Sequence, residues 1–551
     1  MSKSVAGAVA AGDDQASAAK AGWSRRIAAP GRARLLWAGG LLLVGLGLFT
    51  LYLHQSRLGP FNSDGAGNIL QAQSMLHGNL LLSGWTTSDV SFYTTELPEY
   101  MLVVAFRGLR PDVVHICGAL SYTLTVLLAA LLARGRATGR AGVVRALLAG
   151  AIMIAPSIAG GTEVFLEDPD HAGTAVPILL LLLLLDRAPE RWYVPAGVCA
   201  LLAWVQVADR LTLIAATAPV AVVAIVRLLV LAARGRPRRE FRYDALLLVA
   251  AGASVALASL AERAIRLLGG FHENALTFGL LSPVSQIPAN VRMTGRTLLL
   301  LFGANTPDSG HGTSRQLLQI SAHIHLIGLA LAAAGFAAAI ILFFAARTDR
   351  VTQIVAAATV ATLAAGIFGT VLPDLAHAHE VAILLSLGAV LAGRMLPPLA
   401  SSVRWLPGRA LVAALAVWLA AGLAALCFAA SWAPAVTTNQ QLADWLVAHH
   451  YTSGVAGYWQ SSSTTVASGG KVMVAPISYQ ATAPWRWESQ ASWYQPGSWR
   501  ANFVVAVADP TAPGVITEGA ARRSFGRPAH QYQVGQYVVM VYDYNLLTRL
   551  S

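Results

Sequence analysis

Charged residues are scarce in this chain. They make up 12% of its 551 residues, while 56% of the residues are hydrophobic and the mean hydropathy is +0.57. A soluble protein of ordinary composition carries about 25% charged residues. Because so few charges cannot keep a globule of this size in solution, the composition predicts a protein embedded in a membrane.

Several motifs that identify common enzymes and pumps are also missing. The sequence has no P-loop, no Rossmann fingerprint and no nucleophile elbow, so ATP-driven transport and serine hydrolysis have no support in it. Cysteine is rare, and Cys117, Cys199 and Cys427 all lie in apolar segments. No disulfide framework is therefore expected in the C-terminal part of the chain.

Long apolar segments are abundant. A membrane span needs about 20 mostly apolar residues. On that criterion we expect about eleven spans, near residues 35–53, 113–133, 144–160, 173–186, 193–208, 211–233, 244–261, 324–346, 352–372, 381–399 and 409–430. The chain then divides into a disordered N-terminus (1–33), a transmembrane domain (34–430) and a C-terminal domain (431–551).

The arginines predict the orientation of the spans. The net charge is +12, and many Arg residues form clusters between apolar segments, for example at 25–34, 134–145 and 234–242. Such clusters mark cytoplasmic loops rather than a nucleic-acid surface. The N-terminus is then cytoplasmic, and the C-terminal domain and the loops 54–97, 160–172, 262–322 and 373–380 are exported. The scarcity of Lys beside abundant Ala, Gly and Arg favours a bacterial inner membrane.

The C-terminal domain shows alternating helix and strand patterns. Asn439–His450 has helical spacing, and the Ser-rich stretch Gln460–Ser468 is expected to form a second helix. Strand-length apolar runs lie at 454–459, 471–477, 502–508 and 537–543. This alternation predicts a small α/β domain. Its Trp-rich segment, 485–499, either completes the core and an interfacial belt or stacks against sugar rings.

Polar residues of the exported loops are the candidate site. Asp64 lies among glycines in the stretch 62–68, where a tight turn would expose its carboxylate. Alternatively, Asp64 caps the helix that follows. A second acidic group comprises Glu163, Glu167, Asp168, Asp170 and His171. It suits Mg²⁺ or Mn²⁺, or a base with its orienting group, or it caps the next span.

Three further groups carry charge near the membrane surface. The pair Asp209–Arg210 is either an interfacial ion pair or places Arg210 on a phosphate. Arg292 and Arg296 share one face of a helix expected at 284–302 on the membrane surface, where they meet lipid phosphates. His377, His379 and Glu380, in the loop 374–380, have the residue types of a metal site.

Together these features resemble one group of enzymes. An early aspartate in the first exported loop (Asp64), an acidic motif in the second (Glu167–His171) and a long later loop with Arg292 and Arg296 recur in the GT-C superfamily of membrane glycosyltransferases. This superfamily includes protein O-mannosyltransferases, aminoarabinose transferases, oligosaccharyltransferases and actinobacterial arabinosyltransferases. Here Gly65 follows Asp64, where the mannosyltransferase branch has Asp-Glu.

The resemblance implies a GT-C-like fold and a polyprenyl-phosphate sugar as donor. The acceptor would be a hydroxyl of a lipid, a glycan or a protein, and the transfer would invert the anomeric carbon. Asp64 is expected to act as general base, the Glu167–His171 motif to bind a divalent cation, and the arginines to contact the lipid phosphate. Two alternatives are a transporter of a lipid-linked substrate and a non-catalytic assembly protein with the same fold.

Overall fold

The computed structural model describes most of the chain. The described residues are 35–158, 160–167, 171, 173–274, 281–305, 313–344, 348–401, 408–435, 438–497, 499–507 and 515–550. Residues up to Thr50 and residues from Leu51 onward form two separate compact units. The N-terminus predicted to be disordered, 1–33, lies outside the described residues.

Most of the chain is helical, as the hydropathy predicts. Within the described residues, eight helices are long and apolar enough to span a membrane: Leu35–Ser56, Asp112–Arg134, Leu213–Ala233, Glu240–Leu267, Gln319–Phe343, Arg350–Phe368, Ile383–Ala400 and Arg409–Ala429. The expected segments near 144–160, 173–186 and 193–208 form shorter helices. Every expected segment thus contains a helix, and the prediction of a polytopic helical membrane protein is confirmed.

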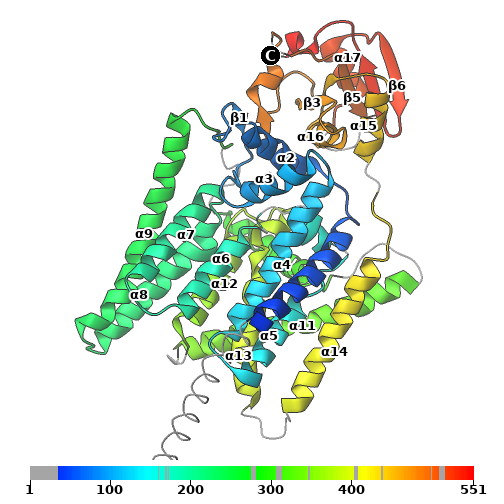
Figure 1. Cartoon of the computed structure of the whole chain (residues 1–551). Coiled ribbons are helices and arrows are strands. Elements are labelled where there is room, and N and C mark those ends of the chain that lie inside the picture. Colours follow the sequence, from blue (N-terminus) through cyan, green and yellow to red (C-terminus); the bar gives the residue numbers. More distant parts are fainter. Residues whose placement is uncertain are drawn as a thin grey trace, which may run out of the picture. The chain divides into compact units, whose positions relative to one another are not determined.

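Figure 1 shows the helices of this region, coloured along the sequence. They are α4 (Asp112–Arg134), α5 (Gly139–Met153), α6 (Ala175–Arg187), α7 (Tyr193–Ala208), α8 (Ala218–Ala233), α9 (Arg238–Leu267), α10 (Ile287–Leu301), α11 (Thr313–Phe344), α12 (Arg350–Phe368), α13 (Ile383–Ser401) and α14 (Gly408–Ala429). A π-helix, Leu213–Thr217, leads into α8, and another, Glu163–Glu167, precedes α6.

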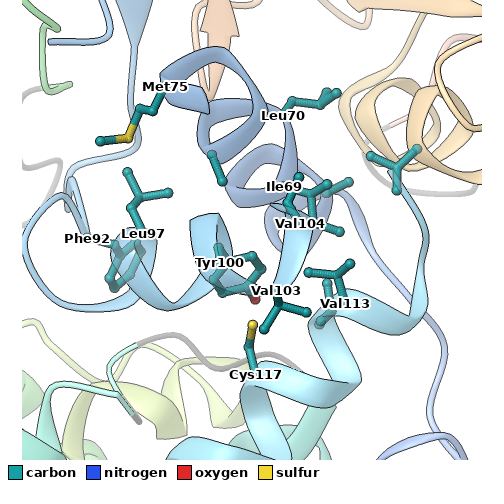
Figure 2. Packing of buried hydrophobic residues seen from close by; sticks show 14 of the residues in the cluster. Ile69, Leu70, Met75, Phe92, Leu97, Tyr100, Val103, Val104, Val113 and Cys117 are labelled. Atoms are coloured by element: carbon teal, nitrogen blue, oxygen red, sulfur yellow. The ribbon is translucent and has the colours of Figure 1, made fainter. Parts of the chain in front are cut away.

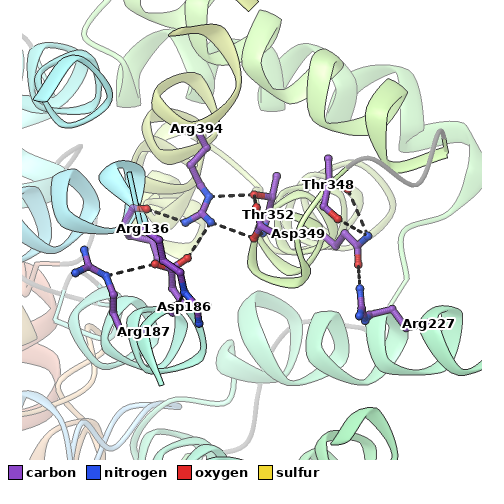
Figure 3. A network of polar contacts seen from close by, with 10 residues as sticks. Arg136, Asp186, Arg187, Arg227, Thr348, Asp349, Thr352 and Arg394 are labelled. Atoms are coloured by element: carbon purple, nitrogen blue, oxygen red, sulfur yellow. Dashed lines mark hydrogen bonds and ion pairs between the residues drawn. The ribbon is translucent and has the colours of Figure 1, made fainter. Parts of the chain in front are cut away.

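A buried arginine ties several of these helices together (Figure 3). Arg394 of α13 contacts Asp186 of α6 at 2.9 Å and Asp349, the N-cap of α12, at 3.0 Å. It also donates to the Leu132 carbonyl of α4 at 2.8 Å. A charge buried among helices is stable only when it is paired and hydrogen-bonded, so these contacts fix the relative positions of four helices.

Two helices of the first loop form a compact layer at one end of the bundle. Helix α2 (Ser63–Leu76) packs on α3 (Glu96–Arg107) and on the start of α4 through a buried apolar cluster, shown in Figure 2. Ile69, Leu97 and Tyr100 are fully buried at its centre. Val466, from the C-terminal domain, belongs to the same cluster. The first loop and the C-terminal domain therefore share a hydrophobic core.

The C-terminal domain is a small α/β domain, as predicted. Its sheet has the order β3-β2-β5-β7-β6, with β3, β2 and β5 parallel and β7 antiparallel to both of its neighbours. The elements are α15 (Thr438–Ala448), β2 (Ser453–Ala456), α16 (Tyr458–Ala467), β3 (Met473–Pro476), β5 (Phe503–Val507), α17 (Glu518–Phe525), β6 (His530–Val534) and β7 (Tyr537–Val541). The sequence pattern did not reveal α17 and β6.

A second, very small sheet attaches this domain to the first loop. Strand β1 (Trp85–Thr86) pairs antiparallel with β4 (Ser489–Gln490). The Asn274 amide, from the segment after α9, donates to the carbonyls of Thr87 and Arg486, each at 2.8 Å. Three segments that are far apart in the sequence thus meet beside α2, and they fix the start of β4.

Candidate functional site

A cavity of about 750 Å³ lies where α2, the His-rich loop near residue 377 and the C-terminal domain meet. Its ionisable lining residues are five carboxylates, three imidazoles and a phenol: Asp64, Asp89, Glu163, Glu380, Glu488, His171, His377, His379 and Tyr458. Trp459 and Trp487 add two large aromatic surfaces. Among the lining residues that the structure describes, none is Lys or Arg. The cavity is therefore strongly acidic.

Asp64 lies in the first turn of α2. The helix begins at Ser63, and the Asn62 side chain is its N-cap, accepting a hydrogen bond from the Gly65 amide at 3.0 Å. The expected tight turn is thus wrong, and Asp64 is not the cap either, because Asn62 takes that role. The positive end of the helix dipole favours an anion in this turn, and the Asp64 carboxylate is half-buried at the cavity wall.

Tyr458 connects Asp64 to the C-terminal domain. Its hydroxyl donates to the Asp64 carboxylate and also lies 3.0 Å from Oε2 of Glu488. The Tyr458 side chain is buried at the first turn of α16. Burial and the two neighbouring carboxylates raise the pKa of Tyr458 well above its usual value, so the phenol keeps its proton.

Helix α16 reaches α2 because its side chains are small. The stretch from Ser461 to Thr465 is fully buried. Ser463 Oγ accepts from Ser63 Oγ of α2 at 3.2 Å, while Thr464 donates back to a carbonyl of its own helix at 2.6 Å. Such back-bonding satisfies hydroxyl groups within a buried interface. Larger side chains here would push Tyr458 away from Asp64.

Glu488 has an unusual backbone conformation. Its φ is +44°, in the left-handed region, and its side chain is 3% exposed. A residue other than glycine held in such a conformation costs about 1–3 kcal/mol and persists only where its surroundings impose it. Here the pairing of β4 with β1 directly follows Glu488 and fixes its direction. Backbone strain of this kind is concentrated at functional sites.

His171, His379 and Glu380 form a second cluster on the cavity wall. The ligand atoms of these three residues lie within 4.8 Å of one another. The rings of His171 and His379 are stacked, with centroids 5.6 Å apart, and His171 Nε2 lies 3.4 Å from Glu380. Nδ1 of His171 is held by Asp209 at 2.8 Å. The group has the composition and spacing of a metal site.

The charges in this cluster depend strongly on one another. Burial alone would lower the pKa of His171, but the carboxylates of Asp209 and Glu380 outweigh it and raise that pKa to about 10. Burial and the neighbouring His171 charge lower the pKa of His379 to about 3. His379 is therefore neutral, with a lone pair available for a cation.

The acidic motif of the second loop is only partly placed. Glu163 is exposed and lines the cavity, while Glu167 lies at the end of the π-helix that Glu163 begins. His171 is in the cluster described above. Asp168 and Asp170 lie outside the described residues. The motif and the loop at 377–380, predicted as two separate candidates, therefore meet through His171.

The arginines expected to contact phosphate do not line the cavity. Arg210 is exposed and pairs with Glu262 at 2.8 Å and Glu273 at 3.2 Å. Its sequence neighbour Asp209 points instead to His171, so the two residues do not form the expected pair. Arg292 and Arg296 are exposed on α10, which confirms the helix predicted there.

Sequence reasoning missed the contribution of Tyr458, Glu488 and Asp89. Tyr458 and Glu488 belong to apolar, aromatic segments that read as domain core, and nothing in their spacing connects them to Asp64. The Trp-rich segment 485–499 was a candidate for stacking against sugar rings, and Trp487 from that segment does line the cavity. Only the three-dimensional pairing of β1 with β4 brings it there.

Comparison with solved structures identifies the fold. The crystal structure of ArnT from Cupriavidus metallidurans bound to undecaprenyl phosphate is similar over 92% of this chain and 97% of that one, with 14% identity and a TM-score of 0.53. The Archaeoglobus fulgidus oligosaccharyltransferase in complex with Zn and sulfate has 12% identity, with 85% of this chain and 67% of that one covered and a TM-score of 0.45. The structure of the oligosaccharyltransferase AglB from the same organism, with an inhibitory peptide and a dolichol-phosphate, has 12% identity, 86% and 70% coverage and a TM-score of 0.42.

The likeness to ArnT extends over nearly the whole of both chains, so the protein has the same fold as ArnT. The fold-level resemblance predicted from the loops is thereby confirmed. No protein-family profile matches the sequence, and no curated protein sequence matches it. What the protein does must therefore be argued from its own cavity.

Proposed function

We propose that this protein is a glycosyltransferase that moves a sugar from a polyprenyl-phosphate carrier to an acceptor hydroxyl. The observation that carries the proposal is the position of Asp64, a carboxylate at a helix N-terminus that faces a large cavity and is held there by Tyr458. The ArnT structure with the same fold is bound to undecaprenyl phosphate. On the predicted topology, the cavity opens on the periplasmic side of a bacterial inner membrane.

Asp64 acts as general base in this proposal. Its carboxylate takes the proton of the acceptor hydroxyl as the acceptor oxygen attacks the anomeric carbon. The bond between that carbon and the phosphate oxygen breaks on the opposite face, so the configuration is inverted and polyprenyl phosphate leaves with the electron pair. Trp459 and Trp487 offer flat apolar faces for sugar rings, and the carboxylates accept hydrogen bonds from sugar hydroxyls.

The departing phosphate needs positive charge, which Lys or Arg side chains do not supply among the described lining residues. We propose that His171, His379 and Glu380 hold a divalent cation that supplies it. Asp209 holds Nδ1 of His171, an arrangement common in metal sites, and a bound cation would replace the proton that His171 carries on Nε2. Two imidazoles favour Zn²⁺ over the Mg²⁺ or Mn²⁺ that the acidic loop motif suggested.

Changing His379 to alanine is expected to abolish metal binding at this site, because one of the two imidazole ligands is lost. The check is the metal content of purified protein after dialysis against a chelator and then a cation, with sugar transfer measured in parallel. His530→Ala, an exposed histidine of the C-terminal domain, is the matched control. Equal metal content in the two variants would contradict the proposed site.

Arg292 and Arg296 keep a predicted role outside the cavity. They are exposed on the same helix, four residues apart, and can reach a lipid phosphate at the membrane surface. Arg210 would have to exchange its contacts with Glu262 and Glu273 for a lipid phosphate, because both carboxylates already pair with it.

Gly67 provides the space that the Glu488 carboxylate occupies. A Cβ atom built on Gly67 would lie 2.0 Å from Oε2 of Glu488. Gly67→Ala favours helix formation by about 1 kcal/mol, so α2 should persist while Glu488 is displaced. We expect sugar transfer to fall with no loss of thermal stability. Gly295→Ala on α10, where the new methyl group meets nothing within 4 Å, is the control. Equal activity of both variants would show that the position of Glu488 is unimportant.

The function itself is tested by sugar release from radiolabelled polyprenyl-phosphate sugars. The purified protein in lipid vesicles is incubated with a panel of donors and with lipid, glycan and peptide acceptors. Transfer identifies donor and acceptor together. Absence of transfer across the panel, from protein shown to be folded, would contradict the proposal.

A further inference from the structure

The hydroxyl group of Tyr458 is in contact with two carboxyl groups at once. It donates to Asp64 and lies 3.0 Å from Oε2 of Glu488. These three residues come from α2, α16 and the segment before β4, so the arrangement joins the first loop to two parts of the C-terminal domain. How the three side chains bind one another depends on how many of them carry a hydrogen that can be donated.

A phenol carries one hydrogen and can donate it to one oxygen at a time. If Asp64 and Glu488 were both ionised, one of the two contacts would bring two oxygens together without a hydrogen between them. A second hydrogen removes this conflict when one carboxyl group is protonated and donates to the Tyr458 oxygen. The geometry is therefore best satisfied when one carboxyl group in the set is neutral.

Burial indicates which of the two is neutral. Glu488 is 3% exposed, and Oε2 of Glu488 lies against the backbone of α2 at Gly67. Removal from water disfavours an ionised carboxylate. Asp64, in contrast, is half-buried on the cavity wall in the first turn of α2, where the helix dipole favours the anion. Asp64 is thus the better site for the negative charge.

We propose that Glu488 is kept protonated and donates to Tyr458, which in turn donates to Asp64 and so keeps Asp64 anionic and correctly oriented. This inference rests on the proposed function and deepens it, because it makes Tyr458 and Glu488 positioning residues for the base. The C-terminal domain is then part of the catalytic apparatus.

Other ionisable groups also face the cavity. Those that line the cavity from other elements are Asp89, Glu163, His171, His377, His379 and Glu380. Helix α16 contains no charged residue; the side chains that follow Tyr458 and Trp459 are mostly small and polar. Arg486, near Glu488 in sequence, is exposed, and its guanidinium lies 5.6 Å from the ring centre of Tyr494.

Substitutions at Glu488 show whether this residue acts as a neutral hydrogen-bond donor or as a charged group. Glu488→Gln keeps an N–H donor, so we expect kcat within about threefold of the unmodified protein. Glu488→Ala and Tyr458→Phe remove the donors and should lower kcat by about 10-fold to 100-fold, the range for a lost hydrogen bond to a charged group. The KM for the donor should change little, and the acidic limb of the pH profile should move to higher pH.

Tyr544→Phe is the matched control. Its hydroxyl donates to the Phe525 carbonyl at 2.6 Å in the same domain but outside the cavity lining. This variant also loses a tyrosine hydroxyl, but one that is not bonded to Asp64, so kcat and the pH profile should stay unchanged. A Glu488→Gln variant as inactive as Glu488→Ala would overturn the proposal, because it would show that the negative charge of Glu488 is needed.

Infrared difference spectra test the protonation state without any activity. The spectrum of the unmodified protein minus that of Glu488→Gln should contain the carbonyl band of a protonated carboxyl group at neutral pH. The subtraction is needed because burial also raises the pKa of Glu96 to about 8 and that of Glu99 to about 7. A carboxylate band in its place would overturn the inference. If no sugar is transferred at all, the proposed function fails, and the spectra still decide the state of Glu488.

Discussion

Asp64→Asn is expected to lower kcat for sugar transfer by about 10²–10⁴-fold, the usual contribution of a general base. Asparagine has nearly the same size and can still accept the Tyr458 hydrogen bond, but it cannot take a proton from the acceptor. The KM for the polyprenyl-phosphate sugar should change much less. The measurement is transfer of radiolabelled sugar by purified protein, under single-turnover and steady-state conditions.

Asp444→Asn makes the same chemical change at an exposed position of α15 and should leave transfer unaffected. Full activity of Asp64→Asn would remove Asp64 from the mechanism. Movement of a lipid-linked sugar across vesicles without cleavage of the sugar–phosphate bond would instead favour a transporter. Neither activity, from folded protein, would favour a non-catalytic assembly role.

Arg394→Met is expected to cause the largest loss of stability. Arg394 and Asp186 are both buried, and their side chains are 2.9 Å apart (Figure 3). Removing one partner of a buried ion pair leaves an uncompensated charge and costs about 3–5 kcal/mol. Thermal unfolding in detergent, followed by the fraction of protein that stays monodisperse, should show a clearly lower transition temperature.

Two variants distinguish the ion pair from a general effect of mutation. Arg187 also contacts Asp186, at 3.4 Å, but its side chain is 45% exposed. Arg187→Met should therefore cost about 1 kcal/mol or less. Adding Asp186→Asn to Arg394→Met should restore part of the lost stability, because the buried negative charge is removed. An Arg394→Met protein as stable as Arg187→Met would show that the pair does not hold the helices together.

Much of the fold could be predicted from hydropathy alone. A lipid environment forces spanning segments to be helical, so a run of apolar residues specifies both position and conformation. Near 173–186 the same criterion cannot tell a full span from a short buried helix, and there the structure has the 13-residue α6. In the C-terminal domain, β6 escaped detection because its residues are mostly exposed and it contains no run of apolar residues.

Some residues of the cavity could be singled out from the sequence, but their assembly could not be predicted. Asp64, His171 and His379 stand out because carboxylates and imidazoles are rare in an apolar chain. Nothing in the sequence says that His171 and His379, more than 200 positions apart, have stacked rings. Arg292 and Arg296 were expected to contact the lipid phosphate; they are exposed on α10 and do not line the cavity.

The contact between residues 64 and 458 also bears on how the protein is made. Asp64 is among the first residues to leave the ribosome, whereas Tyr458 and Glu488 are synthesised several hundred residues later. The spanning helices can insert one after another while the cavity is still incomplete. Under the proposed function, a nascent chain gains activity only once its C-terminal domain has folded onto α2, so that lipid-linked sugars are not cleaved during synthesis.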